Sequence, residues 1–248
     1  MFDDPLSLPT RGAVTLSVLV FVLHAVRALG RSGPREVATR RFSGWMVGMA
    51  LSGALLSHFE PARHHLMRLF PIGGVVGLGA VAASLLSPTL RARFAALGDS
   101  DVRALLAYRA LFGGLLLAMA ALGHLPVSFA LSAGLGDLLV GWAAQAAPGS
   151  LAGRDGSRSM RLLVHGLGLA DVVGVMIGAV AVVRPWSMAH GDATTAMTLP
   201  WVFVPFMFAM NVHGVLQVLA PVSSSAAESE EPRRDGPEPA RRVRSAAS

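Results

Sequence analysis

The sequence predicts an all-α, polytopic membrane protein with seven transmembrane helices, an N-terminus outside the membrane and a C-terminus in the cytoplasm. The first observation behind this prediction is composition, because 53% of the 248 residues are hydrophobic, only 15% are charged, and mean hydropathy is +0.55. A water-soluble chain of this length could not bury so much apolar surface. The second is a series of long apolar runs, and the third is the position of the arginines between them.

Seven apolar runs are long enough to cross a bilayer, for which a helix needs about 20 residues. They are Ala13–Gly30, Phe42–His58, Phe70–Ser87, Ala104–Gly123, Pro126–Ala147, Leu162–Val183 and Thr198–Ala220. The segment Thr89–Leu97 alternates arginine with apolar residues and is expected to form a short interfacial helix. Residues 1–221 are therefore predicted to be one seven-helix transmembrane domain.

The arginines set the predicted orientation, because cytoplasmic connections are enriched in basic residues. Placing the first connection in the cytoplasm puts sixteen arginines inside and four outside, with Arg109 alone inside a span. Residues 222–248 are rich in Ser, Pro, Glu and Arg and lack apolar periodicity, so they are predicted to be a disordered cytoplasmic tail. The expected location is the inner (plasma) membrane, with the lipid bilayer as the main partner.

Two missing residue types exclude several chemistries. The chain has no cysteine, which excludes disulfides, iron–sulfur clusters, thiolate zinc sites and covalently attached c-type haem. It also has no lysine, which excludes a retinal Schiff base. The sequence pI is about 11.4, but the arginines are spread between apolar runs and the tail, so no nucleic-acid partner is expected.

Polar residues inside the predicted spans are the candidate functional residues, because a charge at the bilayer centre costs at least about 2.5 to 3.5 kcal/mol. Asp137 and Asp171 are predicted near the midplane and are the candidate catalytic or proton-carrying acids. Arg109 lies in the cytoplasmic half of its span. The same zone contains the other candidate binding residues, which are His24, His165, Asn211 and His213.

The two aspartates and Arg109 allow two interpretations. In the first, these groups form ion pairs that hold helices together. In the second, they line a polar cavity open to the cytoplasm, where a carboxyl group without a partner keeps its proton and serves as an acid. Asp137 is the expected partner of Arg109, because their spans are joined by two or three residues. Asp171 is then left without a guanidinium partner.

A run of small residues in the sixth span predicts close helix packing. Small residues recur every four positions, at Gly166, Ala170, Gly174 and Gly178. Such a ridge lets another backbone approach closely. It predicts that Asp171, beside the ridge, faces protein.

No cofactor is identified from the sequence, although two alternatives stay open. His58, His64 and His65 form a histidine group between the second and third spans, and imidazole suits zinc, copper or iron. Their spacing is not that of membrane di-iron desaturases, so no metal site is assigned. Two histidines on facing helices could also hold haem b, and His24, His165 and His213 are the candidates.

Several residues in the C-terminal half form a pattern. Tyr108 and Arg109 open one span, Gly-His-Leu-Pro at 123–126 joins it to the next, and Asp137 follows a run of small residues. In this pattern the chain resembles a family of small multi-pass bacterial membrane proteins with no agreed activity. The resemblance implies a multi-pass helical structure and a special role for Arg109 and Asp137.

Three functions remain open from the sequence. The leading hypothesis is a protein that binds or translocates a small solute or a proton through a cytoplasm-facing polar cavity. The second is an intramembrane enzyme that uses Asp137 or Asp171 as an acid on a lipophilic, isoprenoid-like substrate. The third is a structural or accessory membrane subunit. A ligand-sized cavity that reaches both aspartates would favour the first two hypotheses, and a dry Arg–Asp pair would favour the third.

Overall fold

The computed structural model describes residues 7–31, 37–58, 75–152, 157–190 and 199–220, and all regular structure in these ranges is helical. In chain order the elements are α1 (Ser7–Arg31), α2 (Val37–His58), the helix Val75–Leu86, α4 (Pro88–Ala95), α5 (Asp99–Ala121), α6 (Val127–Ala146), α7 (Arg158–Gly178), the π-helical turn η1 (Ala179–Val183), α8 (Arg184–His190) and α9 (Leu199–Leu219). The predicted all-α class is confirmed for these ranges. The predicted tail, 222–248, lies outside the described residues.

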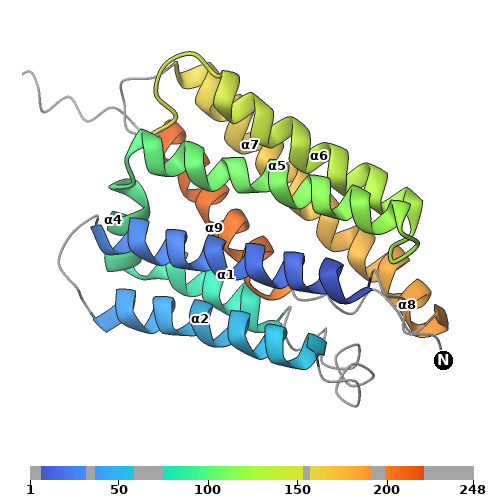
Figure 1. Ribbon diagram of the computed structural model, residues 1–248. Helices are drawn as coiled ribbons and strands as arrows, with labels where there is room; N and C mark the ends of the chain where they lie inside the picture. The colour runs from blue at the N-terminus through green and yellow to red at the C-terminus, as the bar shows by residue number, and fades with distance from the viewer. Residues whose placement is uncertain (1–6, 32–36, 59–74, 153–156, 191–198, 221–248) are drawn as a thin grey trace, which may run out of the picture.

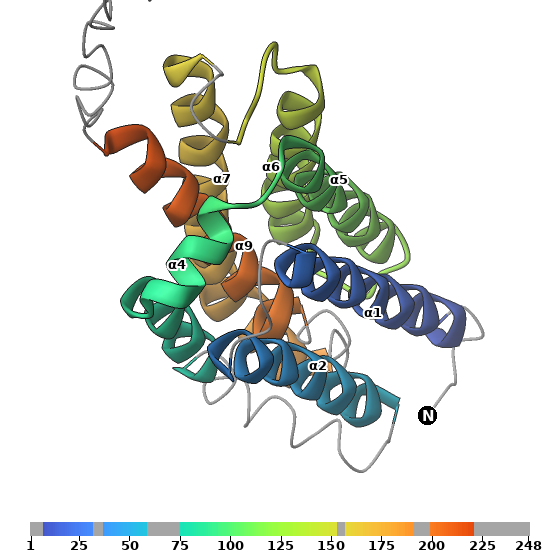
Figure 2. The same cartoon turned by 90° about the vertical axis from the view of Figure 1, so that its left-hand side faces the viewer.

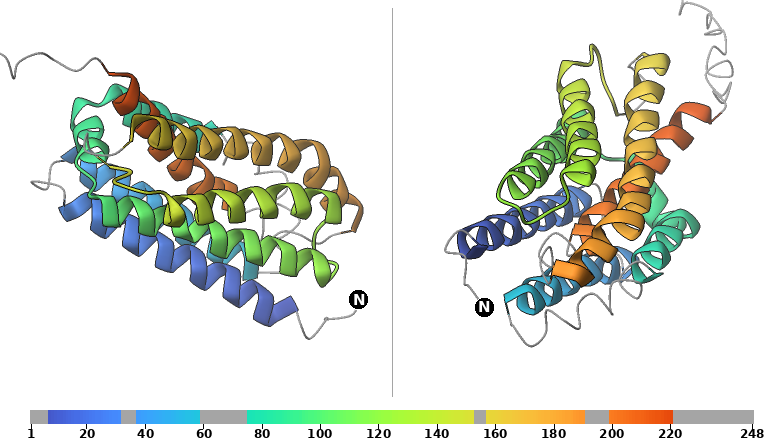
Figure 3. Two further views of the ribbon diagram at one scale, coloured as in Figure 1. Left: turned by 90° about the horizontal axis from the view of Figure 1, so that it is seen from above. Right: turned by 90° about the vertical axis from the view of Figure 1, so that its right-hand side faces the viewer.

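The long helices lie side by side, and consecutive ones run in alternate directions (Figure 1). Seen from one end, α9 passes through the middle of the bundle (Figure 2). In its span Val202–Leu219, 67% of the residues are buried, compared with 22% to 44% of the residues in the other four candidate spans. It contacts α1, α2, α4 and α7, and the views from above and from the opposite end show the same central position (Figure 3).

Five of the described helices are long and apolar enough to cross a membrane. These are Gly12–Arg31, Asp99–Ala121, Val127–Ala146, Arg158–Ser187 and Val202–Leu219. A bent pair, Val75–Leu86 with α4, makes a sixth if it counts as one span. Helix α2 is not among them, and its first turns carry Arg40 and Arg41. The structure thus supports a multi-pass protein with five or six candidate spans, and the count of seven stays a prediction.

The bent pair is broken at Ser87 and Pro88, where the two helices meet at 85°. Ser87 caps α4, since its hydroxyl accepts from the Leu90 N–H at 3.3 Å. Pro88 occupies the first turn of α4, where its lack of an N–H costs nothing. The sequence expectation of a short helix at Thr89–Leu97 corresponds to α4.

The outer surface of the bundle is apolar. Leu23, Ile177 and Trp142 have exposed fractions of 67%, 64% and 68%. Water-soluble monomers rarely expose contiguous apolar patches of large size, whereas lipid-facing helices do. This surface is compatible with a lipid bilayer around the protein.

The predicted small-residue ridge on α7 is wrong at most of its positions. A Cβ added at Gly166 or Gly174 would meet nothing within 4 Å, and Ala170 is exposed. Only Gly178 lies against a neighbour, the ring of Phe129. The helix is turned so that Gly168, between two ridge positions, faces the rest of the bundle.

One end of the bundle collects arginines from the predicted cytoplasmic connections. Arg103 of α5 donates to the Ala144 carbonyl at 2.6 Å and to the Ala147 carbonyl at 3.0 Å, at the end of α6. Arg31, at the end of α1, lies 3.8 Å from Asp101 of α5. We call this the arginine-rich end, formed by α4, the C-terminal ends of α1 and α6, and the N-terminal ends of α2 and α5. Its location in the cytoplasm stays a prediction.

Candidate functional site

The hairpin of α5 and α6 positions the first two site residues. Helix α5 ends in a tight turn in which Gly123 has a φ of +79°, a backbone conformation that favours glycine. The His124 N–H donates to the Met119 carbonyl at 2.8 Å. Arg109 and Asp137 each lie fourteen residues from Gly123, so the antiparallel hairpin brings them to the same level.

Arg109 is the centre of the site and is fully buried, with 0% of its side chain exposed. Its Nε donates to Asp137 Oδ1 at 2.7 Å, and its Nη1 donates to the Gly168 carbonyl at 3.0 Å. Its Nη2 donates to Asp171 Oδ2. The expected contact of Arg109 with an aspartate is confirmed. The expectation that Asp171 lacks a guanidinium partner is wrong, because one arginine serves both carboxylates.

Glycines on the facing helices make these contacts possible. A Cβ at Gly136 of α6 would overlap the Asp171 carboxylate. A Cβ at Gly113 of α5 would lie 2.5 Å from the Gly134 carbonyl and 3.0 Å from the Asp137 Cβ. Larger residues at either position would force α5, α6 and α7 apart. The close packing therefore holds the two carboxylates on the guanidinium.

The two aspartates differ in exposure. The Asp137 side chain is 6% exposed, and the Asp171 side chain is 13% exposed. Asp171 is thus the more accessible carboxylate of the pair. The cluster has one positive charge and two carboxyl groups, so it is neutral when the carboxyls share one proton and negative when both are ionised.

An apolar pocket of about 190 Å³ lies beside α7, lined by Val172, Val173, Met176 and Ile177 together with residues of α9 and of the helix Val75–Leu86. At 100° per residue, these four positions occupy the face of α7 opposite Asp171. None of the three cluster residues lines this pocket.

A second polar group joins α7 to α9. The Nδ1 of His165 lies 3.2 Å from Asn211 Oδ1, and its Nε2 lies 3.5 Å from the Leu151 carbonyl. The Asn211 amide donates to the Met207 carbonyl at 2.8 Å, which turns its oxygen toward the imidazole. Gly168 links this group to Arg109, because its carbonyl accepts from Arg109 and its Cα faces the Asn211 amide.

The other two candidate histidines have different neighbours. The half-buried His24 on α1 lies with its Nδ1 3.5 Å from the Tyr108 hydroxyl. The buried His213 on α9 stacks on Phe94, with ring centroids 4.6 Å apart. The contacts described for these two residues do not include Arg109, Asp137 or Asp171. Their assignment as binding residues stays a prediction.

Within the described ranges, no three His, Asp or Glu side chains lie close enough together to hold a metal ion. His64 and His65 of the predicted outer group fall outside those ranges. The haem candidates His24, His165 and His213 contact Tyr108, Asn211 and Phe94 respectively. A metal site at the outer histidines and haem b at these three histidines therefore stay hypotheses.

Sequence reasoning missed three contributors to the site. Gly168 supplies a carbonyl to Arg109, Gly136 supplies the space for Asp171, and Leu151 supplies a carbonyl to His165. One signal was present, because a glycine stands three residues before each aspartate, at Gly134 and Gly168. No pattern in the sequence indicates that the Leu151 carbonyl contacts His165.

Comparison with known proteins gives a family for the chain. The model of a family described as Domain of unknown function (DUF8737) matches residues 66–219, which include α5, α6, α7 and the whole Arg109 cluster. Searches of the curated proteins and of the solved structures found no significant match. Because the match covers more than half of the sequence, the chain belongs to the family Domain of unknown function (DUF8737).

Proposed function

We propose that this protein is an integral membrane protein in which the cluster of Arg109, Asp137 and Asp171 takes up and releases one proton, and that the proton cycle drives binding or translocation of a small solute from the cytoplasmic side. The observation that supports the proposal is one buried guanidinium bonded to two carboxyl groups. Such a site has two states that differ by one proton and by one unit of charge.

The two protonation states of the cluster differ in net charge, and this difference decides which state a buried site favours. In a medium that solvates ions poorly, a neutral cluster is favoured over a charged one. The neutral state contains Arg109 as a cation, one carboxylate and one protonated carboxyl. Loss of the proton leaves a net negative charge between α5, α6 and α7, which a cationic solute or a rearrangement of the helices would have to offset.

Asp171 is the carboxyl that exchanges the proton in this proposal. Its side chain is 13% exposed, whereas Arg109 is 0% and Asp137 6% exposed. Asp137 then stays ionised against Arg109 Nε, where the distance is 2.7 Å. Arg109 binds the carboxylates and sets their orientation, and it does not itself lose a proton because guanidinium stays protonated in proteins.

Difference infrared spectroscopy tests the proton directly. We expect the full-length protein in lipid nanodiscs to show the carbonyl stretch of a protonated carboxyl group near neutral pH, and to lose it when the pH is raised. Asp171→Asn should remove this band, because Asn cannot carry the proton. Asp101→Asn is the matched control, since Asp101 lies outside the cluster and faces Arg31. A band that survives in Asp171→Asn would overturn the assignment.

Proteoliposomes test whether the protein moves protons across a membrane. Vesicles with a trapped pH-sensitive dye should show proton movement under an imposed membrane potential for the wild-type protein and for Asp101→Asn, and not for Asp171→Asn. An equal signal from empty vesicles and from vesicles with the wild-type protein would contradict the proposal.

A structural role for the cluster is the second candidate, and the burial of Arg109 and Asp137 favours it, as a dry ion pair would. The described pockets at α7 and at the arginine-rich end are not lined by the cluster residues, so the proton proposal depends on the partial exposure of Asp171. Arg109 uses three nitrogens to contact two different helices, α6 and α7. In that case Asp171→Asn should lower stability without changing any proton signal. The infrared measurement thus separates the two functions.

A further inference from the structure

The arginine-rich end contains a pocket that is separate from the Arg109 cluster. It has a volume of about 540 Å³ and lies between α1, α2 and α4. Its eight lining residues include four arginines, two hydroxyl residues and no acid: Val26, Arg27, Gly30, Arg31, Thr39, Arg40, Ser43 and Arg93. Among the described residues, this lining has donors and positive charge and no carboxylate.

Arg93 is the key residue of this pocket. It is only 4% exposed, and its one described hydrogen bond is a long one, from Nη1 to the Leu29 carbonyl at 3.4 Å. Its Nη2 is buried and has no hydrogen-bond partner among the described residues. A buried guanidinium nitrogen without an acceptor is costly. An anion in the pocket would satisfy it.

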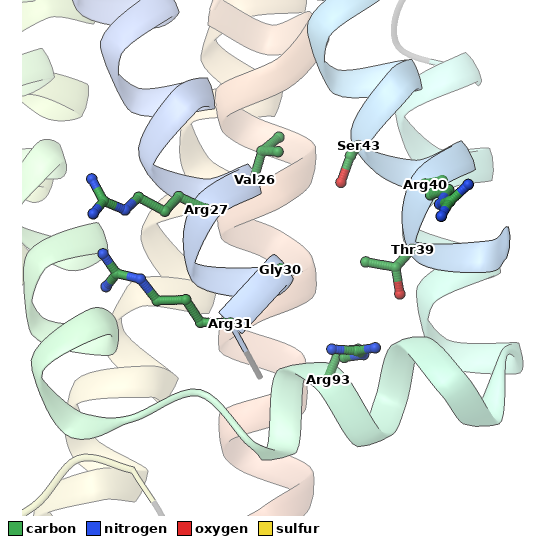
Figure 4. A pocket seen from close by; sticks show the side chains of 8 residues that line it. All are labelled: Val26, Arg27, Gly30, Arg31, Thr39, Arg40, Ser43 and Arg93. Atoms are coloured by element: carbon green, nitrogen blue, oxygen red, sulfur yellow. The ribbon is translucent and has the colours of Figure 1, made fainter. Parts of the chain in front are cut away.

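Thr39 adds a second unsatisfied donor on the opposite wall. The residue is 5% exposed, and its buried hydroxyl has no hydrogen-bond partner in the part of the chain that the structure describes. Figure 4 shows Thr39 and Ser43 on α2 beside the gap to α1, with the Arg93 guanidinium below the same gap. Threonine, serine and arginine all donate to oxyanions. The three side chains thus surround one space with donors.

The other arginines add positive charge at longer range. In Figure 4, the guanidinium groups of Arg27 and Arg31 extend from α1 away from α2. Arg31 is 57% exposed and lies 3.8 Å from Asp101, so its charge is partly offset. The lining as a whole remains positive, which raises the local concentration of anions.

We propose that this pocket binds a phosphate group, with Arg93 as its charged donor and Thr39 and Ser43 as hydroxyl donors. Arginine matches phosphate because its planar guanidinium can donate two parallel hydrogen bonds to it. The phosphate comes either from the headgroup of an anionic phospholipid or from a soluble phosphate compound. Both sources offer the same non-bridging oxygens to the same donors.

Two binding measurements on the full-length protein distinguish the sources. Inorganic phosphate is titrated by calorimetry into protein held in phosphatidylcholine nanodiscs, which supply no anionic lipid. Native mass spectrometry then compares retention of phosphatidylglycerol and phosphatidylcholine by protein in neutral detergent. Binding of phosphate identifies a soluble ligand, and selective retention of phosphatidylglycerol identifies a lipid headgroup. Either result supports the site, and the absence of both overturns it.

The variants locate the binding at this pocket. Arg93→Gln should weaken binding about tenfold or more, because it removes the charged donor. Arg91→Gln is the matched control, since Arg91 is exposed and lies on the same short helix. Equal losses in the two variants would mean general surface charge and would overturn the proposal.

Thr39→Val keeps every charge and nearly the same volume, and it covers the case in which Arg93→Gln does not fold. The Thr39 hydroxyl makes no hydrogen bond within the described ranges, so the variant should unfold at the wild-type temperature. Its phosphate or phosphatidylglycerol binding should nevertheless be several-fold weaker. Unchanged binding in Thr39→Val would remove the hydroxyl residue from the site and contradict the arrangement proposed.

Discussion

The carboxylate of Asp171 packs directly against Gly136, on the neighbouring helix α6, and leaves no room for a side chain there. Gly136 stands beside Asp137, so one short stretch of α6 supplies both a carboxylate to Arg109 and the space for the other carboxylate. The position of Asp171 on Arg109 therefore depends on a residue that has no side chain and makes no side-chain hydrogen bond. This makes Gly136 a sensitive probe of the cluster.

Gly136→Ala should lower the free energy of unfolding by about 1–3 kcal/mol, because the new methyl group displaces Asp171 from Arg109. Gly174→Ala on α7 is the matched control, since a Cβ there would meet nothing within 4 Å. Alanine in place of glycine favours a helix by up to about 1 kcal/mol, so the control should be neutral or more stable. Thermal unfolding, monitored by tryptophan fluorescence, measures the stability of both variants. Equal stability of the two variants would contradict the packing described.

Arg109→Gln should destabilise the protein by about 3–5 kcal/mol, because it leaves two carboxyl groups without a cation. Arg158→Gln, at an exposed position at the start of α7, should change little. Denaturant-induced unfolding in detergent micelles provides the comparison.

A charge-balanced variant separates the loss of the ion pair from the loss of packing. Combining Arg109→Gln with Asp137→Asn and Asp171→Asn removes all three charges while keeping similar volumes. This triple variant should be more stable than Arg109→Gln alone, because no uncompensated charge remains. A triple variant that is less stable than the single one would show that the charges are not what makes Arg109 necessary.

The sequence predicted the length of the spans better than their rotation. Periodicity and composition placed one span at Pro126–Ala147, where the structure has α6 at Val127–Ala146. For α7, the prediction that Asp171 faces protein is confirmed by its contact with Arg109, but the ridge from which it was drawn is wrong at most positions, since one residue of error turns a helix by 100°. Gly166 and Gly174 were therefore predicted to pack against another helix, whereas a Cβ at either position meets no described atom within 4 Å.

In the candidate site too, the contact set by a short connection could be predicted and the contact set by helix rotation could not. The contact of Arg109 with Asp137 could be predicted, because a short turn fixes the register of the two helices. The contact of Arg109 with Asp171 could not, because α6 and α7 are joined by a longer connection and the rotation of α7 decides which side chains face α5. The break at Ser87 could also be predicted, because the apolar run ends there and a separate short helix was expected at Thr89–Leu97, but the 85° angle between the two helices could not.

Asn211→Leu should destabilise the protein by about 1–3 kcal/mol, because it removes the oxygen that faces His165 Nδ1 and leaves the buried ring nitrogen unpaired. Gln217→Leu is the matched control, a half-buried amide on the same helix. Thermal unfolding of the two variants in nanodiscs gives the difference. A larger loss for Gln217→Leu would show that the His165–Asn211 contact does not contribute to stability.

The topology of the termini is the last prediction, and it bears on the number of spans. We expect the N-terminus outside and the C-terminus in the cytoplasm, because basic residues are retained on the cytoplasmic side and the described arginines Arg31, Arg93 and Arg103 gather at one end of the bundle. Opposite sides require an odd number of crossings. The five candidate spans meet this condition if α2 and the bent pair both cross the membrane or if neither does.

Fusions at each terminus measure the outcome. A fluorescent protein fused to the C-terminus should be bright, and alkaline phosphatase fused there should be inactive, because the first folds in the cytoplasm and the second requires export. An epitope tag at the N-terminus should be accessible to antibody from outside. If both termini are cytoplasmic, the count is even, and exactly one of α2 and the bent pair crosses the membrane. If the C-terminus is outside, the arginine-rich end faces outward and the predicted cytoplasmic access to Asp171 is lost.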